Sequence, residues 1–576
     1  MIIYLEEGCI SIELRPSSGD ERKQYVYIYR SSDSISEQSA ALSTYEHIPI
    51  LPDINLPNSE KSFNYLKNCL KTCVETDDEC RQDLSSPPRR LLRIGSPGDS
   101  VVSLYETPAT FREPYVALSY CWGKKVTLRT TRENIQSLMK GFDLAELPAT
   151  IRDAIHITRK LGLKYIWIDA LCIIQLDKQD WEEQSVKMCS IYEQAYLTIA
   201  AFSAGSSDVS FANPSSRPLT FHYRIADEPD IILAARVECT SGHHYNPTGR
   251  VLTAPETILT RGWTLQESIL ATRCISYSTD ELQWRCRSES SCECEMPGDW
   301  RRDIIRDEPS FLLWNQVVEQ YTQRQLSFPG DKLPALSGIC QLISSQVGSW
   351  YLAGLWEDGL PYCLLWEKAT DVEGSNVPVP PEYRAPSFSW ASLDCPVYPF
   401  TDVQSVYQSA RVVDSTILLE GIDPFGLVKP GASITAERKL IRDVGVYSVE
   451  GRFAAYRIRP RGTRDEEIVA DGLLEAFGFQ DSSGLPQRSV RRSTRDASQE
   501  PEGGDTVLMV KEFESTVSLF LVAYRHYEPN KSTTYYFLVL SVSSSNHDAY
   551  ERLGTIGMGY DNGEFDDVPE QTITIL

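Results

Sequence analysis

The chain has 576 residues, of which 41% are hydrophobic and 24% are charged, so about three or four globular units are expected. Its net charge of −24 argues against sequence-independent binding to nucleic acid or to an anionic membrane, because both need a basic face. The first residues lack the pattern of a secretory signal, and no apolar run approaches the ~18 residues of a membrane span. We therefore expect a cytoplasmic protein without a membrane span or a nucleic-acid partner. Its 15 cysteines are expected to be reduced thiols.

Residues 1–113 are expected to form an N-terminal region of short helices and strands. Residues 1 to about 60 show no pattern that assigns a fold. A helix is predicted over 63–80, where apolar residues recur at helical spacing. Two short strands are predicted next, at 91–94 and 101–105.

Residues 114–280 alternate between strand and helix patterns. Strands are predicted at 115–119, 165–168, 197–201 and 273–277. Helices are predicted from Pro148 to Gly162, from a cap at Asp180 completed by Glu183, and over 263–270, the last after a polar insertion at about 205–258. This alternation indicates an α/β fold with an open, mostly parallel sheet flanked by helices, in which ligands bind beyond the carboxyl ends of the strands.

The remaining chain is expected to form two further regions. A mostly helical extension is predicted at 281–385, and a β-rich C-terminal region at 386–576. Within the latter, about 481–505 is rich in Ser, Arg, Gly and Glu with few apolar residues, which predicts a disordered loop.

Three blocks, at 115–123 (YVALSYCWG), 165–175 (YIWIDALCIIQ) and 261–267 (RGWTLQE), are the most specific features of the chain. Together they resemble the fungal heterokaryon incompatibility (HET) domain, over about 115–277. The resemblance implies a fungal protein of non-self recognition, in which the domain triggers growth arrest or programmed cell death. The HET family is in turn distantly similar to Toll/interleukin-1 receptor (TIR) domains, which implies a TIR-like, flavodoxin-like sheet and NAD as a substrate.

Glu267 is the catalytic candidate that this resemblance singles out. Catalytic TIR domains place a glutamate on the helix after the third strand, often four residues after a tryptophan, and Trp263 and Glu267 have that spacing. Residues four apart share one helix face. The carboxylate would stabilise the positive charge that develops on ribose as nicotinamide leaves, or would orient a ribose hydroxyl. Alternatively, Glu267 pairs with Arg261 or Arg273 and fixes the helix to the sheet.

The remaining pocket residues are predicted at strand ends. The first strand ends in Ser119, Tyr120, Trp122 and Gly123, and Asp169 ends the second. Gly123 would let the backbone approach a phosphate and Trp122 would stack on a base, whereas core packing is the alternative for both aromatic residues. Asp169 would bond a ribose or orient a side chain, or else cap the next turn through backbone amides. No bound cofactor is expected.

A metal site is not predicted. Three cysteines (Cys69, Cys73, Cys80) and three more (Cys286, Cys292, Cys294) lack paired Cys-x2-Cys spacing, and His243-His244 has no second spaced pair. Cys121 and Cys172 are expected to pack as small hydrophobic side chains. Glu182 and Glu183 are expected to stabilise a helix N-terminus rather than to form a catalytic pair.

Two functions of different classes fit the sequence. One is a cell-death effector that cleaves NAD. The other is a non-catalytic protein-protein interaction module that docks onto itself or onto an incompatibility partner, with the C-terminal region recognising the partner.

Overall fold

The computed structural model describes most of the chain, which divides into two compact units, 1–308 and 309–576. From residue 56 onwards it describes all residues except 83–84, 125–127, 213–218, 224–230, 238–256, 280, 294–310, 370–379, 381, 450–454, 459–465, 471–487, 492–506, 528–531, 562–564 and 566. Before residue 56 it describes residue 48 and four strands.

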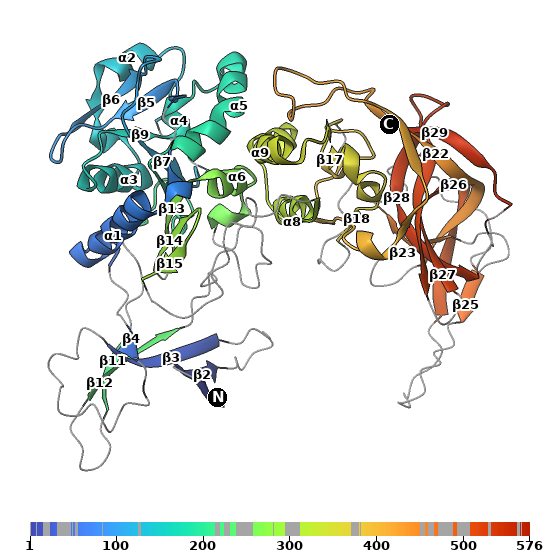
Figure 1. The fold of residues 1–576 in the computed structure, drawn as a ribbon, viewed down its shortest axis with the longest axis horizontal. Helices are drawn as coiled ribbons and strands as arrows, with labels where there is room; N and C mark the ends of the chain where they lie inside the picture. Colours follow the sequence, from blue (N-terminus) through green and yellow to red (C-terminus); the bar gives the residue numbers. More distant parts are fainter. Residues whose placement is uncertain are drawn as a thin grey trace. The chain divides into compact units, whose positions relative to one another are not determined.

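The first unit contains a six-stranded sheet that joins the N-terminus to the predicted insertion. The strands from the N-terminus are β1 (Ile2–Glu6), β2 (Cys9–Leu14), β3 (Gln24–Ser31) and β4 (Ile50–Leu51), and those from the insertion are β11 (Leu219–Tyr223) and β12 (Ile231–Val237). The order is β1-β2-β3-β12-β11, with β4 beside β3 (Figure 1). Part of the insertion that was expected to be polar is therefore strand. Ile231–Val237 is itself an apolar run, but its pairing with a segment some 200 residues away is not visible in a local pattern.

The second sheet of this unit has nine strands and carries the candidate site. Its strands are β5 (Arg90–Arg93), β6 (Val101–Glu106), β7 (Val116–Ser119), β8 (Phe142–Asp143), β9 (Tyr165–Trp167), β10 (Leu197–Ala200), β13 (Arg273–Tyr277), β14 (Leu282–Cys286) and β15 (Ser290–Cys292). Their order is β15-β14-β13-β10-β7-β9-β5-β6-β8.

The expectation of a mostly parallel sheet holds only for the centre of this sheet. Strands β9, β7, β10 and β13 are parallel, whereas the outer strands are antiparallel to their neighbours. The sheet is therefore mixed. Part of the reason is connectivity: hairpins join β5 to β6 and β13 to β14 to β15, and a hairpin can only produce antiparallel pairing. The antiparallel pairs β5–β9 and β6–β8 join strands that are not consecutive in the chain.

Helices cover both faces of the nine-stranded sheet (Figure 1). They are α1 (Glu60–Thr76), α2 (Ile135–Lys140), α3 (Ala149–Lys160), α4 (Asp169–Cys172), α5 (Lys178–Gln194) and α6 (Trp263–Leu270). Helices α1 and α3 share one apolar core with the strands, while α5 and α6 contact each other on the opposite face. The predicted cap of α5 was wrong by three residues, because Asp177, not Asp180, accepts the capping hydrogen bond.

The alternation of side chains along the central strands gives the two faces different chemistry. Leu118, Ile199 and Ile275 point into the core with α1 and α3. The alternate positions Ser119, Thr198 and Cys274 line a cavity together with residues of α6. This second face is built of small and polar residues, so α6 packs closely against it and its polar side chains meet those of the strands.

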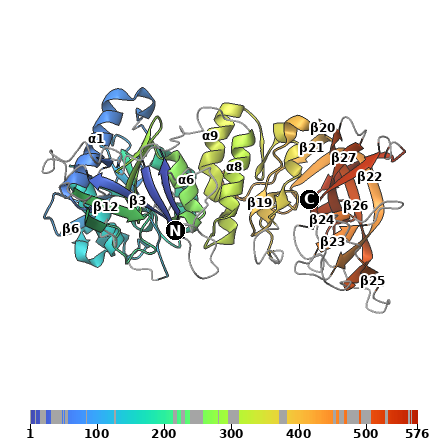
Figure 2. The same ribbon diagram turned by 90° about the horizontal axis from the view of Figure 1, so that it is seen from below.

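The second unit begins with α8 (Phe311–Thr322), α9 (Ser337–Val347) and two small two-stranded sheets, and most of it is one sheet, antiparallel except where β28 meets β29. β16 (Tyr351–Leu352) pairs with β17 (Leu355–Trp356), and β18 (Glu367–Lys368) pairs with β19 (Val397–Tyr398). The sheet strands are β20 (Tyr407–Gln408), β21 (Arg411–Thr416), β22 (Ser433–Val449), β23 (Ala455–Ile458), β24 (Glu466–Ala470), β25 (Arg488–Arg491), β26 (Val507–Tyr527), β27 (Ser532–Val542), β28 (Tyr550–Asp561) and β29 (Glu570–Ile575). The β-rich C-terminal region is thus confirmed (Figure 2).

The segment predicted as a disordered loop, at about 481–505, lies outside the described residues except for β25, which pairs with β26. In the described part of the whole chain, no helix is both long and apolar enough to cross a membrane.

Candidate functional site

The fold brings the predicted site residues together between the sheet and α6. Ser119 is the last residue of β7, Asp169 follows β9 and begins α4, and Glu267 lies on α6. The Ser119 hydroxyl donates a hydrogen bond to the Glu267 carboxylate. Both side chains are buried, each with only 4% of its surface exposed. The strand ends and the helix, which are about 100 to 150 residues apart in sequence, therefore form one polar cluster.

Glu267 occupies an environment that disfavours its charge. Burial raises the pKa of Glu267 to about 7. The positive charge of Arg261 and hydrogen bonds from Ser119 and Tyr192 oppose this rise, while the negative charge of Asp169 adds to it. A carboxyl group with such a pKa exchanges its proton near neutral pH, as a general acid or base must.

Asp169 orients a side chain and caps a turn, which are two of the roles that its position suggested. One carboxylate oxygen accepts a hydrogen bond from the Trp122 indole at 2.7 Å, and the other accepts one from the Ala170 backbone amide, also at 2.7 Å. Burial raises the pKa of Asp169, although Arg261 and these hydrogen bonds oppose the rise. Asp169 thus caps its own turn and also fixes an aromatic side chain.

Arg261 is the cation shared by the two carboxyl groups. Burial opposes its charge, but Glu267 and Asp169 outweigh that effect and raise the pKa of Arg261. Its guanidinium also donates to the Tyr120 carbonyl oxygen. Arg273, the other predicted partner of Glu267, donates instead to the Cys80 carbonyl oxygen at 2.7 Å.

Tyr192 is a member of the cluster that sequence reasoning did not single out as a site residue. Its hydroxyl has a single proton, which it can donate either to the Leu118 carbonyl oxygen, at 3.2 Å, or to the Glu267 carboxylate. The only sequence signal was its place on the buried face of a predicted helix, which describes an ordinary core residue equally well.

The aromatic candidates are packed within the protein. Tyr120 is buried in the core, and Trp122 is partly buried against it. Trp263 is partly buried and meets Trp181 edge to face, with ring centroids 6.4 Å apart. All three are thus at least partly covered by the protein.

Gly123 allows a close approach of the chain to itself. Its φ is +79°, and a Cβ atom there would lie 2.5 Å from the Cβ of Ser206. The neighbouring Ser207 hydroxyl donates to the Trp122 carbonyl oxygen at 2.9 Å. The turn after β7 is therefore fastened to the segment that follows β10.

We expect Gly123→Ala to destabilise the first unit by about 2–3 kcal/mol, because it combines left-handed backbone strain with a steric clash. Gly162 is a matched control, since its φ is +78° but a Cβ atom there would have no neighbour within 4 Å. Gly162→Ala should cost only about 1–2 kcal/mol. Urea unfolding of both variants measures the difference, and equal losses would contradict the close approach at Gly123.

A small cavity adjoins the cluster at Ser119. Its other lining residues come from β10, β13, α6 and the segments around them: Thr198, Ala200, Phe202, Ile258, Leu259, Thr264, Ser268 and Cys274. The Thr198 hydroxyl has no hydrogen-bond partner among the described residues. The cavity has room for about one water molecule, and Glu267 and Asp169 do not line it. This cavity is therefore too small for a ligand of nucleotide size.

The other reactive side chains near the strand ends are inert at neutral pH. Burial raises the pKa of the Cys121 thiol to about 11 and that of the Cys172 thiol to about 12, so both are protonated. Glu183 pairs with Arg89 at 2.9 Å and Glu182 with Lys178 at 3.8 Å. These two glutamates therefore form ion pairs at the surface of α5.

One protein-family model matches the part of the chain that contains Ser119, Asp169 and Glu267. The model described as heterokaryon incompatibility protein (HET) matches residues 115–267, somewhat more than a quarter of the chain. The match begins at the first of the three sequence blocks and ends at Glu267, which confirms the resemblance to the HET domain. No curated protein and no solved structure matches the chain.

Proposed function

We propose that this chain is a cell-death effector of fungal non-self recognition, in which residues 115–267 cleave NAD in the manner of TIR domains. The HET match implies a function related to heterokaryon incompatibility. The observation that carries the chemical part of the proposal is Glu267, a buried carboxyl group with a pKa of about 7 beside Ser119 and Asp169.

The position of the cluster in the sheet supports a ligand site. The parallel strands lie in the order β9-β7-β10-β13, so the first strand in the chain lies between the second and the third. Connections from β7 and β10 leave in opposite directions, and ligands of such sheets bind beyond the carboxyl ends at this point. Ser119 ends β7 at this location.

The proposed reaction is hydrolysis of the bond between ribose and nicotinamide. At pH 7 about half of Glu267 is ionised, since its pKa is about 7. The carboxylate stabilises the positive charge on the ribose carbon as nicotinamide leaves with the bonding electron pair. Water adds to that carbon and loses a proton, which gives nicotinamide and ADP-ribose.

Substrate entry requires the closed cluster to open. Glu267 is 4% exposed, and the adjoining cavity has room for about one water molecule. In this proposal the closed arrangement is the resting state, and self-association of the chain moves α6 away from β7.

The test is nicotinamide release from NAD by the purified full chain, both free and artificially clustered. Glu267→Gln and Glu267→Ala should each lower the rate of the clustered protein by about 100-fold or more, because they remove a charge that acts on the transition state. Glu183→Gln is the matched control, since that residue is on the surface of α5 and pairs with Arg89 and Gln179. Absence of turnover in both states, or full turnover by Glu267→Ala, would contradict the proposal.

The second candidate is a non-catalytic interaction module that docks onto itself or onto a partner protein. The closed cluster favours it, because Ser119, Tyr192 and Arg261 already engage the Glu267 carboxylate and hold α6 on the sheet. Cell killing in a fungal host distinguishes the candidates. Toxicity that survives Glu267→Ala, in protein that shows no nicotinamide release, supports docking.

A further inference from the structure

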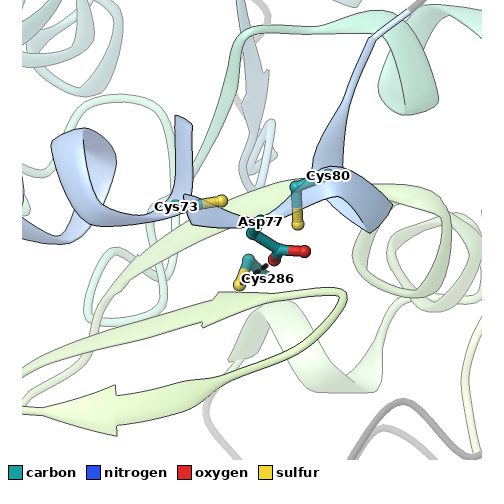
Figure 3. A group of neighbouring side chains, drawn as sticks. All are labelled: Cys73, Asp77, Cys80 and Cys286. Carbon is teal, nitrogen blue, oxygen red and sulfur yellow. Dashed lines mark hydrogen bonds between the residues drawn. The ribbon is translucent and has the colours of Figure 1, made fainter. Parts of the chain in front are cut away.

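Three cysteines and one aspartate from two distant segments converge in the first unit, away from the Glu267 cluster. Cys73, Asp77, Cys80 and Cys286 lie beside one another, and each offers one sulfur or oxygen atom as a metal ligand (Figure 3). These four atoms all lie within 4.8 Å of one another. The three cysteines are buried and Asp77 is partly buried.

The fold explains why these residues meet. Cys73 lies in the last turn of α1, Asp77 is the residue after the helix, and Cys80 ends the short 3-10 helix that follows. Cys286 ends β14, at the turn into β15. The Cys286 thiol donates to the Asp77 carboxylate at 3.7 Å, across 209 residues of sequence.

We propose that Cys73, Asp77, Cys80 and Cys286 bind one zinc ion in a structural, four-coordinate site. Three thiolates and one carboxylate are ligands that zinc accepts, and four protein ligands leave no position open for catalysis. With Zn–S bonds of about 2.3 Å, tetrahedral geometry requires ligand atoms about 3.8 Å apart. The observed separations of at most 4.8 Å reach that value with small rotations of the side chains.

Neighbouring groups are placed to stabilise thiolates. The guanidinium of Arg273 donates to the sulfur of Cys73 at 3.1 Å, and its charge partly offsets the four anionic ligands. The backbone amides of Ser288 and Glu289, in the turn after β14, donate to the sulfur of Cys286. Such donors to the ligand atoms are the usual second layer of a metal site.

The arrangement also suggests what the ion would do. It would join the end of α1 to the β14–β15 hairpin, which is an edge of the nine-stranded sheet. Contacts around the site already link these segments: Arg287 donates to the Glu79 carbonyl oxygen at 2.9 Å. Closing so long a loop restricts the unfolded chain strongly, so the ion would stabilise the unit that contains the HET region.

The first test is the metal content of the full chain, purified without chelator. We expect about one zinc per chain, released by a thiol-blocking reagent. After zinc is removed, added Co²⁺ alone should produce the visible bands of tetrahedral cobalt and the ultraviolet bands of cobalt–thiolate charge transfer. Wild-type protein that contains no zinc and gives no tetrahedral Co²⁺ spectrum would overturn the proposal without any variant.

Variants then assign the ligands. Cys286→Ser should lower the zinc content at least tenfold, and Asp77→Asn should shift the Co²⁺ spectrum. Cys292→Ser is the matched control, because Cys292 is a buried cysteine of the same hairpin that is not part of the cluster. If Cys292→Ser loses as much zinc as Cys286→Ser, or Cys286→Ser keeps its zinc, the assignment is wrong. Nicotinamide release plays no part in these measurements, so their outcome is independent of the proposed function.

Discussion

Glu267→Gln is expected to stabilise the first unit at pH 8 by about 3 kcal/mol, although the substitution removes a charge from a hydrogen-bonded cluster. The folded pKa of Glu267 is about 7, above the ordinary value of 4.5 that the unfolded chain approaches. Below about pH 4.5 Glu267 is protonated in both the folded and the unfolded state, so it does not lower the free energy of unfolding. As the pH rises the unfolded state ionises first, so stability falls until the pH passes about 7 and the cost is complete. Glutamine resembles the neutral acid and removes this cost.

The measurement is urea unfolding of wild type and variant at pH 8 and at pH 5.5. At pH 5.5 the gain should fall to about half, because the folded protein still holds its proton while the unfolded chain has partly lost it. Glu183→Gln, on the surface of α5, should change stability by less than about 1 kcal/mol at both pH values. A gain that does not depend on pH would contradict the raised pKa. If the stabilised variant also loses nicotinamide release, Glu267 is retained at a cost in stability that catalysis explains.

Arg90→Ala is expected to destabilise the first unit by about 3–5 kcal/mol, because it breaks a buried ion pair and leaves its partner behind. Arg90 is 1% exposed and donates to Asp180, which is 4% exposed. Arg90 also donates to the Cys172 carbonyl oxygen at 2.8 Å, and Asp180 accepts from the Ile174 amide at 2.8 Å. The pair therefore fastens β5 to the segment between α4 and α5, next to Asp169.

Thermal or urea unfolding of two further variants separates the pair from its surroundings. Arg89→Ala removes the neighbouring, partly exposed arginine, 3.5 Å from the other oxygen of Asp180, and should cost less than about 1 kcal/mol. The double variant Arg90→Met/Asp180→Leu should recover much of the loss, since it leaves no buried charge unpaired. A loss from Arg90→Ala no larger than that from Arg89→Ala would show that the pair contributes little.

Local sequence patterns determined the core elements of the site-bearing sheet. The four central strands and helices α1, α3 and α6 lie within a few residues of their predicted bounds. Apolar periodicity and the Pro148 and Gly162 boundary signals suffice for this, because they act within one element. The HET blocks predicted the family match at residues 115–267. The cap at Asp180 was wrong because Asp177 offers the same carboxylate chemistry three residues earlier.

The candidate site was predicted as a set of residues but not as an environment. The rule that ligands bind beyond the carboxyl ends of parallel strands predicted that Ser119, Asp169 and Glu267 lie close together. That rule could not predict the protonation state or the solvent accessibility of these residues, because both depend on the close packing of α6 over a face of small side chains. The contribution of Tyr192 was hidden for the same reason, because a helix pattern does not show which buried side chain meets a carboxylate.

By itself the sequence determined the alternating α/β elements, the HET resemblance and the residues at the strand ends, since each depends on neighbours within one or two elements. Only the tertiary structure decided three other properties: the antiparallel edges of the sheet, the closed state and raised pKa of Glu267, and the meeting of Cys286 with Cys73, Asp77 and Cys80. The antiparallel pairing of β5 with β9 and the meeting of Cys286 with the end of α1 depend on contacts between segments about 70 to 210 residues apart, and the environment of Glu267 depends on solvent exclusion. Neither spacing nor composition encodes these contacts locally.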